Sequence, residues 1–327
     1  MAEQARALPG VGVFVPWLTF GAILAAALFI VFVSTAGSAV LDAATTAAAR
    51  NGLSRLVHGD PLLSLAEIRG LASVSMVLLL QPLAVLGLML LIELAAGPRD
   101  RASKNYKLAW MVQAAFLGFA AVLNHAVTKA SPLPWRPLVE MGATDGLAST
   151  LFITLPMYLL ALFVSDFFIY WLHRAQHRFA ILWRFHAVHH SPRDMDVLHN
   201  ITHPIETMGS LIAVALPTSL LIGVNSGQLF VLTAFIGVQS YVHHMNVPMH
   251  FGRLGWLFVD NRYHFIHHGI ERAQSNTNFA SYFPIIDRLF GTWQAPQPGP
   301  LPPTGLASGQ PASLSHYLLG RWPGHKV

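Results

Sequence analysis

Histidine side chains gather in one part of the chain, at spacings that suit metal binding. Thirteen of the 17 histidines lie between His173 and His268. They form one HxxxH cluster and two HxxHH clusters, which are His173/His177, His186/His189/His190 and His264/His267/His268. Residues three and four apart share one face of a helix, so the three imidazoles of each HxxHH cluster are expected to converge. A basic run facing lipid headgroups is the alternative, but it does not account for two copies of HxxHH.

The number of imidazoles predicts how many metal ions the chain binds. The three clusters hold eight histidines, whereas a tetrahedral zinc site takes about four ligands. We therefore expect two metal ions. Iron, zinc, copper and nickel all accept imidazole, so the residue type alone leaves the metal open.

The composition excludes an ordinary soluble protein. Of the 327 residues, 54% are hydrophobic and 11% are charged, whereas a soluble domain has about 25% charged residues. The net charge is +5, and in so apolar a chain we attribute it to cytoplasmic loops facing anionic lipid, with no nucleic acid partner. The absence of cysteine excludes disulfides, thiolate metal sites and cysteine nucleophiles.

Membrane-spanning elements are expected to position the histidines. About 20 apolar residues cross a bilayer as a helix, and the segments that suffice are 11–33, 71–92, 108–127 and 147–170. The apolar stretch 211–242 is interrupted at residues 225–227, which predicts a hairpin dipping into the membrane or two tilted spans. The first segment could be a signal peptide, although its length favours an uncleaved anchor.

Loop charges predict the orientation of these spans. Lysine and arginine are concentrated between the second and third spans and directly after the fourth. By the positive-inside rule, the N-terminus and the histidine clusters lie on the cytoplasmic side. A lipid chain could then reach the histidines from the membrane, while electrons and oxygen arrive from the cytosol.

Together these patterns predict an all-α, multi-pass integral membrane protein. We expect about four transmembrane helices, a short membrane-dipping hairpin and a cytoplasmic, histidine-rich helical cap that holds a di-metal site. Residues 1–146 would form an N-terminal transmembrane region with three spans, and residues 147–294 a catalytic region. Residues 295–327 contain seven prolines, which predicts a flexible tail.

Several motifs resemble those of the fatty acid hydroxylase superfamily, also called the sterol desaturase family. Stretches 166–178 and 182–192 resemble its first two histidine boxes, and 264–268 resembles its closing box. The shorter elements are similar to its HPxE, HxN, NYG and WDxxFGT signatures: His203-Pro-Ile-Glu206, His244-Met-Asn246, Asn278-Phe-Ala and Asp287-Arg-Leu-Phe-Gly-Thr292. The resemblance covers residues 158–293 and leaves the first 140 residues without a signature.

The resemblance implies a membrane-bound, non-haem di-iron oxidoreductase with two iron ions per chain and O₂ as co-substrate. Its substrate would be a lipid, of which one C–H bond is hydroxylated or desaturated. Electrons would come from a separate donor protein, such as a ferredoxin, a cytochrome b5-like protein or a reductase, because the chain has no cysteine and no HPGG haem-binding signature. No catalytic residue apart from the metal site is implied.

The resemblance also assigns roles to individual residues. The implied metal ligands are His173, His177, His186, His189, His190, His264, His267 and His268, with His244 as a ninth and His203 as a candidate tenth. Five polar residues would support them: Asp166, Glu206, Asn246, Asn278 and Asp287. Capping and loop hydrogen bonds are the alternative role for these five.

The sequence departs from the family pattern at a few positions. Phe279 and Ala280 replace the Tyr and Gly of NYG, and Ile286 stands where Trp is common. Gln239 occupies a position at which some members have a further histidine, and His243 is a candidate replacement. The choice between His243 and His244 as a ligand therefore stays open.

Two other functions are compatible with the histidine pattern. A membrane metal transporter or metal-binding protein would also gather imidazoles, but transporters bury their ligands near the bilayer midplane, often with acidic partners. A structural membrane protein with an inactive site would not need the complete set of boxes. We take lipid oxidation as the leading hypothesis, with the lipid and the choice between hydroxylation and desaturation left open.

Overall fold

The described part of the chain is mostly helical, with one very short parallel strand pair. The computed structural model describes residues 85–95, 111, 137–141, 150–193, 195–224, 226–249, 251–297 and 300–321. In chain order, the elements after the helix Val85–Ala95 are β1 Val139–Glu140, η1 Thr150–Thr154, α5 Leu155–Arg178, α6 Ala180–His190, η2 Val197–His199, α7 Pro204–Ser210, η3 Leu211–Ala215, α8 Leu216–Leu221, β2 Ile222–Gly223, α9 Ser226–His244, η4 Gly252–Trp256, α10 Asn261–His267, α11 Arg272–Ser275, α12 Pro284–Leu289 and α13 Leu314–Leu319. Strand β1 pairs with β2, so that Val139 lies opposite Ile222.

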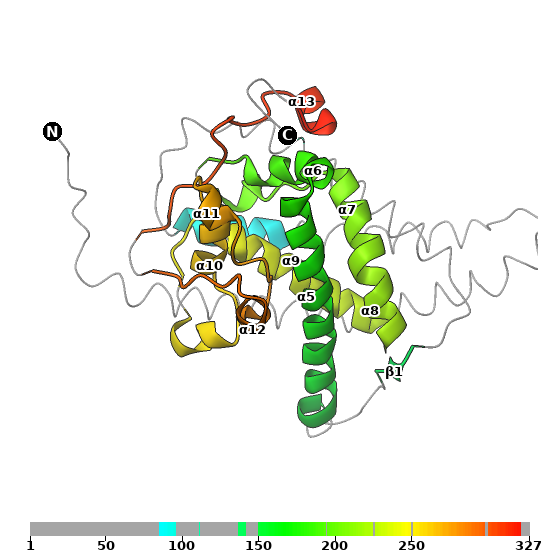
Figure 1. Ribbon diagram of the computed structural model, residues 1–327. Coiled ribbons are helices and arrows are strands. Elements are labelled where there is room, and N and C mark those ends of the chain that lie inside the picture. The colour runs from blue at the N-terminus through cyan, green and yellow to red at the C-terminus, as the bar shows by residue number, and fades with distance from the viewer. Residues whose placement is uncertain are drawn as a thin grey trace, which may run out of the picture.

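A long apolar helix projects from the group of shorter helices. It runs from Leu151 to Arg178 through η1 and α5, and its 28 residues are enough to cross a membrane. Pro156 lies in the first turn of α5, directly after the π-helical turn η1. Apolar side chains such as Phe163 and Phe167 are exposed along it, and Figure 1 shows its lower part extending beyond the other helices. An exposed apolar surface of this kind fits a lipid environment.

A second candidate span lies beside α5. Helices α7, η3 and α8 continue as one helical stretch of 18 residues, Pro204–Leu221, which contacts α5 and runs alongside it in Figure 1. Among the described residues, these two helices are the ones that are long and apolar enough to span a membrane. The second ends at Leu221 and α9 begins at Ser226, so the chain breaks between two helices slightly before the predicted interruption at 225–227, of which Ser226 and Gly227 lie in the first turn of α9.

The predicted spans coincide only in part with the described structure. The fourth, 147–170, lies largely within the helix that ends at Arg178, and that helix therefore carries His173 and His177 itself. The end of the second span falls in the helix 85–95. Spans 11–33 and 108–127 lie outside the described residues, apart from Met111. The number of four spans and the cytoplasmic orientation therefore stay predictions.

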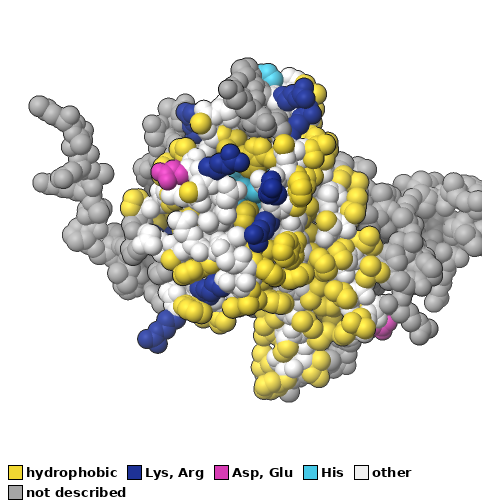
Figure 2. Space-filling model, viewed as in Figure 1, with side chains coloured by type: hydrophobic (Ala, Val, Ile, Leu, Met, Phe, Trp, Pro, Cys, Tyr) yellow, Lys and Arg dark blue, Asp and Glu magenta, His cyan; other side chains and the backbone are white. Residues whose placement is uncertain are grey.

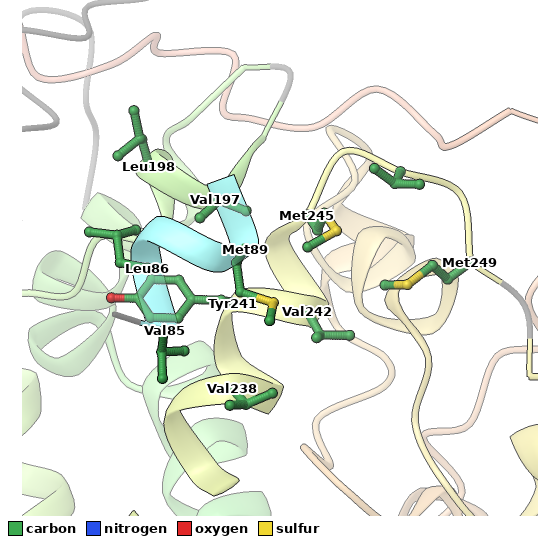
Figure 3. Close-up of a cluster of buried hydrophobic side chains, with 11 residues drawn as sticks. Val85, Leu86, Met89, Val197, Leu198, Val238, Tyr241, Val242, Met245 and Met249 are labelled. Carbon is green, nitrogen blue, oxygen red and sulfur yellow. The ribbon is translucent and has the colours of Figure 1, made fainter. Parts of the chain in front are cut away.

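The helix 85–95 packs against α9 and η2. Its buried side chains join those of α9 and of the following loop in one apolar cluster (Figure 3), which comprises Val85, Leu86, Met89, Val197, Leu198, Val238, Tyr241, Val242, Met245, Val247 and Met249. The buried carboxylate of Glu93 accepts hydrogen bonds from the backbone N–H of Val197 at 3.3 Å and of Asn246 at 2.6 Å. The cluster and this carboxylate together fix the C-terminal end of α9.

Residues 300–321 fold back onto the helices and are not the flexible tail that their prolines predict. Tyr317 on α13 is buried, and its hydroxyl donates to the carbonyl of Thr202. Thr304 is also buried, and its hydroxyl donates to the carbonyl of Pro192 at 3.1 Å. The proline count predicts an extended backbone, but it carries no information about the two side chains that anchor this backbone.

Replacing Tyr317 with alanine should release this segment. Removing a buried aromatic side chain costs about 3–5 kcal/mol, and the carbonyl of Thr202 loses its hydrogen bond. We expect a lower thermal unfolding temperature of the purified protein and faster proteolytic cleavage within residues 300–321. Leu319→Ala, at an exposed position of the same helix, is the matched control and should change neither. Equal cleavage of both variants and the parent chain would contradict the anchoring role.

Candidate metal centre

Nine histidines converge in two adjacent groups near the C-terminal end of α5. The first group is His173, His177, His186, His190 and His267, and the second is His189, His244, His264 and His268. Within each group, one ring nitrogen per histidine lies within 4.8 Å of all the others. The rings of His190 and His268 stack across the two groups, with centroids 4.3 Å apart. His177 is half-buried and the other eight are buried.

Each HxxHH cluster divides its histidines between the two groups. His186 and His190 of α6 belong to the first group and His189 to the second, whereas His264 and His268 belong to the second group and His267 to the first. A helix turns by about 100° per residue. Around its axis, the first and fifth positions of an HxxHH cluster are therefore about 40° apart, whereas the fourth position is about 100° from the fifth. The expectation that all three imidazoles of one cluster converge is therefore wrong.

A sharp turn brings the first two histidine clusters together. Phe179 has an extended backbone (φ −106°, ψ 120°) that ends α5 and caps α6, while its N–H still donates to the carbonyl of Ala175. Helix α6 consequently packs against α5. The Nε2 atoms of His177 and His190 come to lie 3.1 Å apart.

Two polar residues before the third cluster place α10 against α9. The side-chain amide of Asn261 donates to the carbonyls of Met245 and Val247, at 2.8 and 2.5 Å, and its oxygen accepts the N–H of Met249 at 2.9 Å. Asp260 caps α10 by accepting the N–H of Tyr263 at 3.0 Å. Sequence reasoning missed both residues, although an Asp directly before a helical histidine pattern is an N-cap signal.

Hydrogen bonds on the outer side of the rings fix five of the histidines. In each case Nδ1 donates to an oxygen: His173 to Phe279 O at 2.8 Å, His186 to Glu206 Oε1 at 2.6 Å, His189 to Ile201 O at 2.9 Å, His244 to Ser240 O at 2.6 Å and His267 to Thr277 O at 2.8 Å. With the proton on Nδ1, each Nε2 keeps its lone pair. Metal-binding histidines characteristically make such outer hydrogen bonds.

The inward-facing nitrogens fit a cation in each group. The Nε2 atoms of His186 and His190 are 3.1 Å apart, and those of His264 and His268 are 3.0 Å apart. Two nitrogens bound to one ion at about 2.1 Å would be separated by about 3.0–3.4 Å. The buried Nε2 atoms of His173 and His267 have no hydrogen-bond partner among the described residues, which is costly unless a cation is bound. The donor set therefore fits two metal ions.

Burial keeps these imidazoles neutral. Desolvation lowers the pKa of His186 to about 3 and that of His189 to about 4, from an ordinary value of 6.5. It also holds the pKa of His264, His267 and His268 well below that value, and the neighbouring imidazoles lower it further. Only the neutral ring can donate a lone pair to a metal.

Two buried carboxylates shape the loop that holds the outer side of His173. Asp287 accepts the backbone N–H of Phe279 at 2.9 Å and of Ala280 at 2.7 Å. Asp166 accepts the next three N–H groups, of Ser281, Tyr282 and Phe283, at 2.7–3.0 Å. Neither carboxylate touches the histidines, so both act through the position of the Phe279 carbonyl.

Asn278 forms the turn at the start of this loop and anchors the loop with its side chain. It is the only non-glycine with a positive φ (58°) among the described residues, a conformation that Asn tolerates better than most residues. Its side-chain amide donates to the carbonyls of Tyr263 and Gln294, at 3.1 and 3.0 Å. The loop is therefore tied to α10 as well as to Asp287.

The remaining predicted residues occupy different environments. Glu206 is the one predicted acid with a direct hydrogen bond to a histidine of the groups, His186. Asn246 gives its backbone N–H to Glu93, a residue that sequence reasoning missed. His244 lies in the second group, whereas Nε2 of His243 lies 2.7 Å from the side-chain amide of Gln239. The geometry favours His244 over His243.

His203 is not brought to either group. Its Nδ1 accepts the N–H of Ile205 at 3.1 Å, as the N-cap of α7, and its Nε2 donates to the carbonyl of Leu318 at 3.0 Å. Both ring nitrogens are therefore engaged away from the other histidines.

A variant separates the capping role of His203 from a metal-binding role. Asparagine is among the best N-cap residues, so His203→Asn should keep α7 in place. We expect metal content per chain equal to that of the parent, measured by elemental analysis. His186→Asn is the matched comparison and should lower it. Loss of metal from His203→Asn at unchanged helix content by circular dichroism would show instead that His203 binds metal.

The buried imidazoles predict how stability depends on pH. Their pKa values are near 6.5 when unfolded but lower when folded, so the unfolded state takes up protons first as the pH falls. Stability is therefore complete above about pH 6.5, and each such histidine removes up to about 1.4 kcal/mol per pH unit below it. We expect the unfolding temperature of the metal-free protein to fall steeply between pH 7 and pH 5. Added metal should shift this fall to lower pH, whereas a flat profile would contradict the burial of neutral rings.

Comparison with known proteins shows what the region of the two histidine groups is similar to. Residues 158–292 match the fatty acid hydroxylase family model. The chain is 36% identical over 140 residues to the ornithine lipid hydroxylase OlsE of Rhizobium tropici, covering 42% of this chain and 41% of the relative. It is 26% identical over 167 residues to the alkylglycerol monooxygenase of Caenorhabditis elegans, covering 49% and 32%.

A third relative is the very-long-chain aldehyde decarbonylase GL1-6 of Oryza sativa subsp. indica, 29% identical over 140 residues, covering 39% of this chain and 21% of the relative. The chain thus spans less than half the length of each of these curated relatives. No solved structure matches. The family model covers the segments that carry all nine histidines, and the resemblance seen in the sequence is confirmed: residues 158–292 match the fatty acid hydroxylase family.

Proposed function

We propose that this protein is a membrane-bound oxidoreductase that binds two iron ions and uses O₂ and external electrons to hydroxylate or desaturate a C–H bond of a lipid. Hydroxylation consumes one O₂, two electrons and two protons and yields the alcohol and water; desaturation yields the alkene and two waters. The electrons come from a separate donor protein. The proposed catalytic region is residues 147–294, and the clusters face the cytoplasm.

The observation that carries this proposal is the division of nine neutral imidazoles into two adjacent groups. A single structural metal would need about four ligands, and nothing about it would require a second group in stacking contact with the first. The names of two relatives support a lipid substrate, since one is an ornithine lipid hydroxylase and the other is an alkylglycerol monooxygenase. The exposed apolar surface of α5 supports a substrate that arrives from the membrane.

The nine histidines of the two groups are the proposed ligands. When bound, the iron ions supply the oxidising power that breaks an unactivated C–H bond. Burial keeps the nine rings neutral, and in five of them the outer hydrogen bond to a carbonyl or to Glu206 holds the remaining proton on Nδ1. Because those hydrogen bonds are made to helices and a braced loop, the rings need little rearrangement when metal binds.

Phe279 excludes water from one side of the first group. Its ring is buried and lies 5.2 Å from that of His177 and 5.5 Å from those of His173 and His267, centroid to centroid. An apolar wall protects a reactive site from unproductive proton and water chemistry. Because Phe279 stands where the family motif has a tyrosine, this wall carries no hydroxyl group.

Single-ligand variants from the two groups test the proposal. The purified parent chain should contain close to two iron ions, and cells that express it should accumulate a lipid that has gained one oxygen atom or lost two hydrogens. His267→Ala removes a proposed ligand of the first group and His189→Ala one of the second. We expect each to lose iron and to lower product formation by at least about 100-fold, measured by elemental analysis and lipid mass spectrometry.

The control is His316→Ala, which replaces a histidine outside both groups and should keep full iron content and product. Firm zinc binding without iron-dependent turnover would argue for a metal-binding protein instead. Metal flux across proteoliposomes would argue for a transporter. Unchanged lipid product in both ligand variants would exclude the proposed site.

A further inference from the structure

A cavity of about 630 Å³ opens beside the first histidine group. Three arginines line it: Arg174 and Arg178 from the last turns of α5, and Arg272 from α11. Its other walls include Trp171, Phe179 and Phe279, and none of the described residues that line it is an acid. A concave site with three guanidinium groups and no acid has an uncompensated positive potential.

The three arginines are held differently. Arg174 donates to the hydroxyl of Tyr170 at 2.7 Å, and its guanidinium lies 5.8 Å from the centre of the Trp171 ring. Arg178 and Arg272 are exposed, and no hydrogen bond or ion pair of either guanidinium occurs within the described part of the chain. Arg174 is thus a fixed charge, while Arg178 and Arg272 have their donors free. Guanidinium groups bind phosphate and carboxylate through paired hydrogen bonds.

The cavity reaches the proposed metal site. His177 lines it and is the least buried of the nine histidines. Phe279 also lines it, and the Phe279 ring contacts the rings of His173 and His267 edge to face. A molecule held by the arginines therefore lies against the first histidine group.

The cavity also borders the apolar surface of α5. Trp171 and Phe179 are exposed aromatic side chains at its edge. Figure 2 shows Lys and Arg side chains gathered around a visible histidine, where α11 and the upper end of α5 face the viewer, with hydrophobic surface continuing below along α5. An aromatic residue beside arginines at the end of an apolar helix is typical of the membrane interface. The occupant is therefore expected to have an anionic head and an apolar tail.

We propose that this cavity binds the anionic headgroup, a phosphate or a carboxylate, of the lipid substrate. Arg178 and Arg272 bind the headgroup, and Arg174 adds a fixed positive charge. The inference rests on the proposed function and deepens it: the oxidised carbon lies close to the headgroup, because arginines and His177 line one cavity. Docking of an acidic electron donor would also use positive charge, but a concave site with aromatic walls that reaches a ligand histidine favours a lipid.

Binding of short-chain lipids to the purified full-length protein in a neutral detergent tests the proposal. Two matched pairs serve as probes: dihexanoyl phosphatidate against dihexanoyl phosphatidylcholine, and N-octanoylglycine against its methyl ester. By isothermal titration calorimetry, we expect at least one anionic probe to bind about tenfold more tightly or better than its partner. The double variant R178Q/R272Q should lose this preference. Arg253→Gln, an exposed arginine outside the cavity, should retain it.

Three outcomes would overturn the proposal. One is equal binding of both members of each pair to the parent chain, and another is an unchanged preference in R178Q/R272Q. The third is equally tight binding of glycerol 3-phosphate, which would indicate a site for a soluble anion. If the double variant keeps its lipid preference but is reduced more slowly by an acidic donor, the cavity region serves protein docking instead.

The experiment also separates this inference from the proposed function. Iron content is measured on the same samples, and R178Q/R272Q should contain as much iron as the parent. Loss of anion selectivity at full iron content supports headgroup binding. Absence of selectivity at full iron content overturns only the headgroup inference, whereas absence of iron from a parent chain that still selects anions overturns only the di-iron function.

Discussion

The fold depends on holding nine unprotonated nitrogens face to face in a buried site. Neutral imidazoles whose lone pairs point at one another repel, and in a low-dielectric interior neither water nor protons relieve this repulsion at little cost. The chain tolerates the arrangement because each outer nitrogen that is fixed by a carbonyl or by Glu206 leaves its inner nitrogen only one favourable partner, a cation. Metal binding and folding are therefore coupled in this region.

The helical repeat explains why two short helices suffice for two groups. Helix α6, and helix α10 together with its C-cap residue His268, carry the same HxxHH pattern, and each contributes its first and fifth positions to one group and its fourth to the other. The group that receives two histidines from α6 receives one from α10, and the reverse holds for the other group, so both helices contribute to both groups. Displacing either helix would disturb both groups at once, which accounts for the polar bracing by Asn261, Asp260 and Glu93 at the ends of α9 and α10.

Periodicity and composition predicted the parts of the structure that local spacing determines. Three features were predictable: the apolar run before His173, the break before α9 and the convergence of histidines four residues apart within each cluster. Each depends on residues within a few turns of one another. The assignment of each histidine to the first or the second group was not predictable, because it depends on how α6 and α10 face each other. The roles of His203 and Tyr317 also escaped prediction, since their partners Leu318 and Thr202 are 115 residues away.

One helix sets the relation between the membrane, the histidines and the positive cavity. In the last two turns of α5, His173 and His177 are four residues apart, and Arg174 and Arg178 repeat that spacing one residue later. A shift of one residue turns the side chain by about 100° and raises it by about 1.5 Å. The imidazoles therefore face inward while the guanidiniums line the adjacent cavity at nearly the same height. Because the same helix carries the exposed apolar surface, the register of α5 sets the height of His173 and His177 relative to that surface.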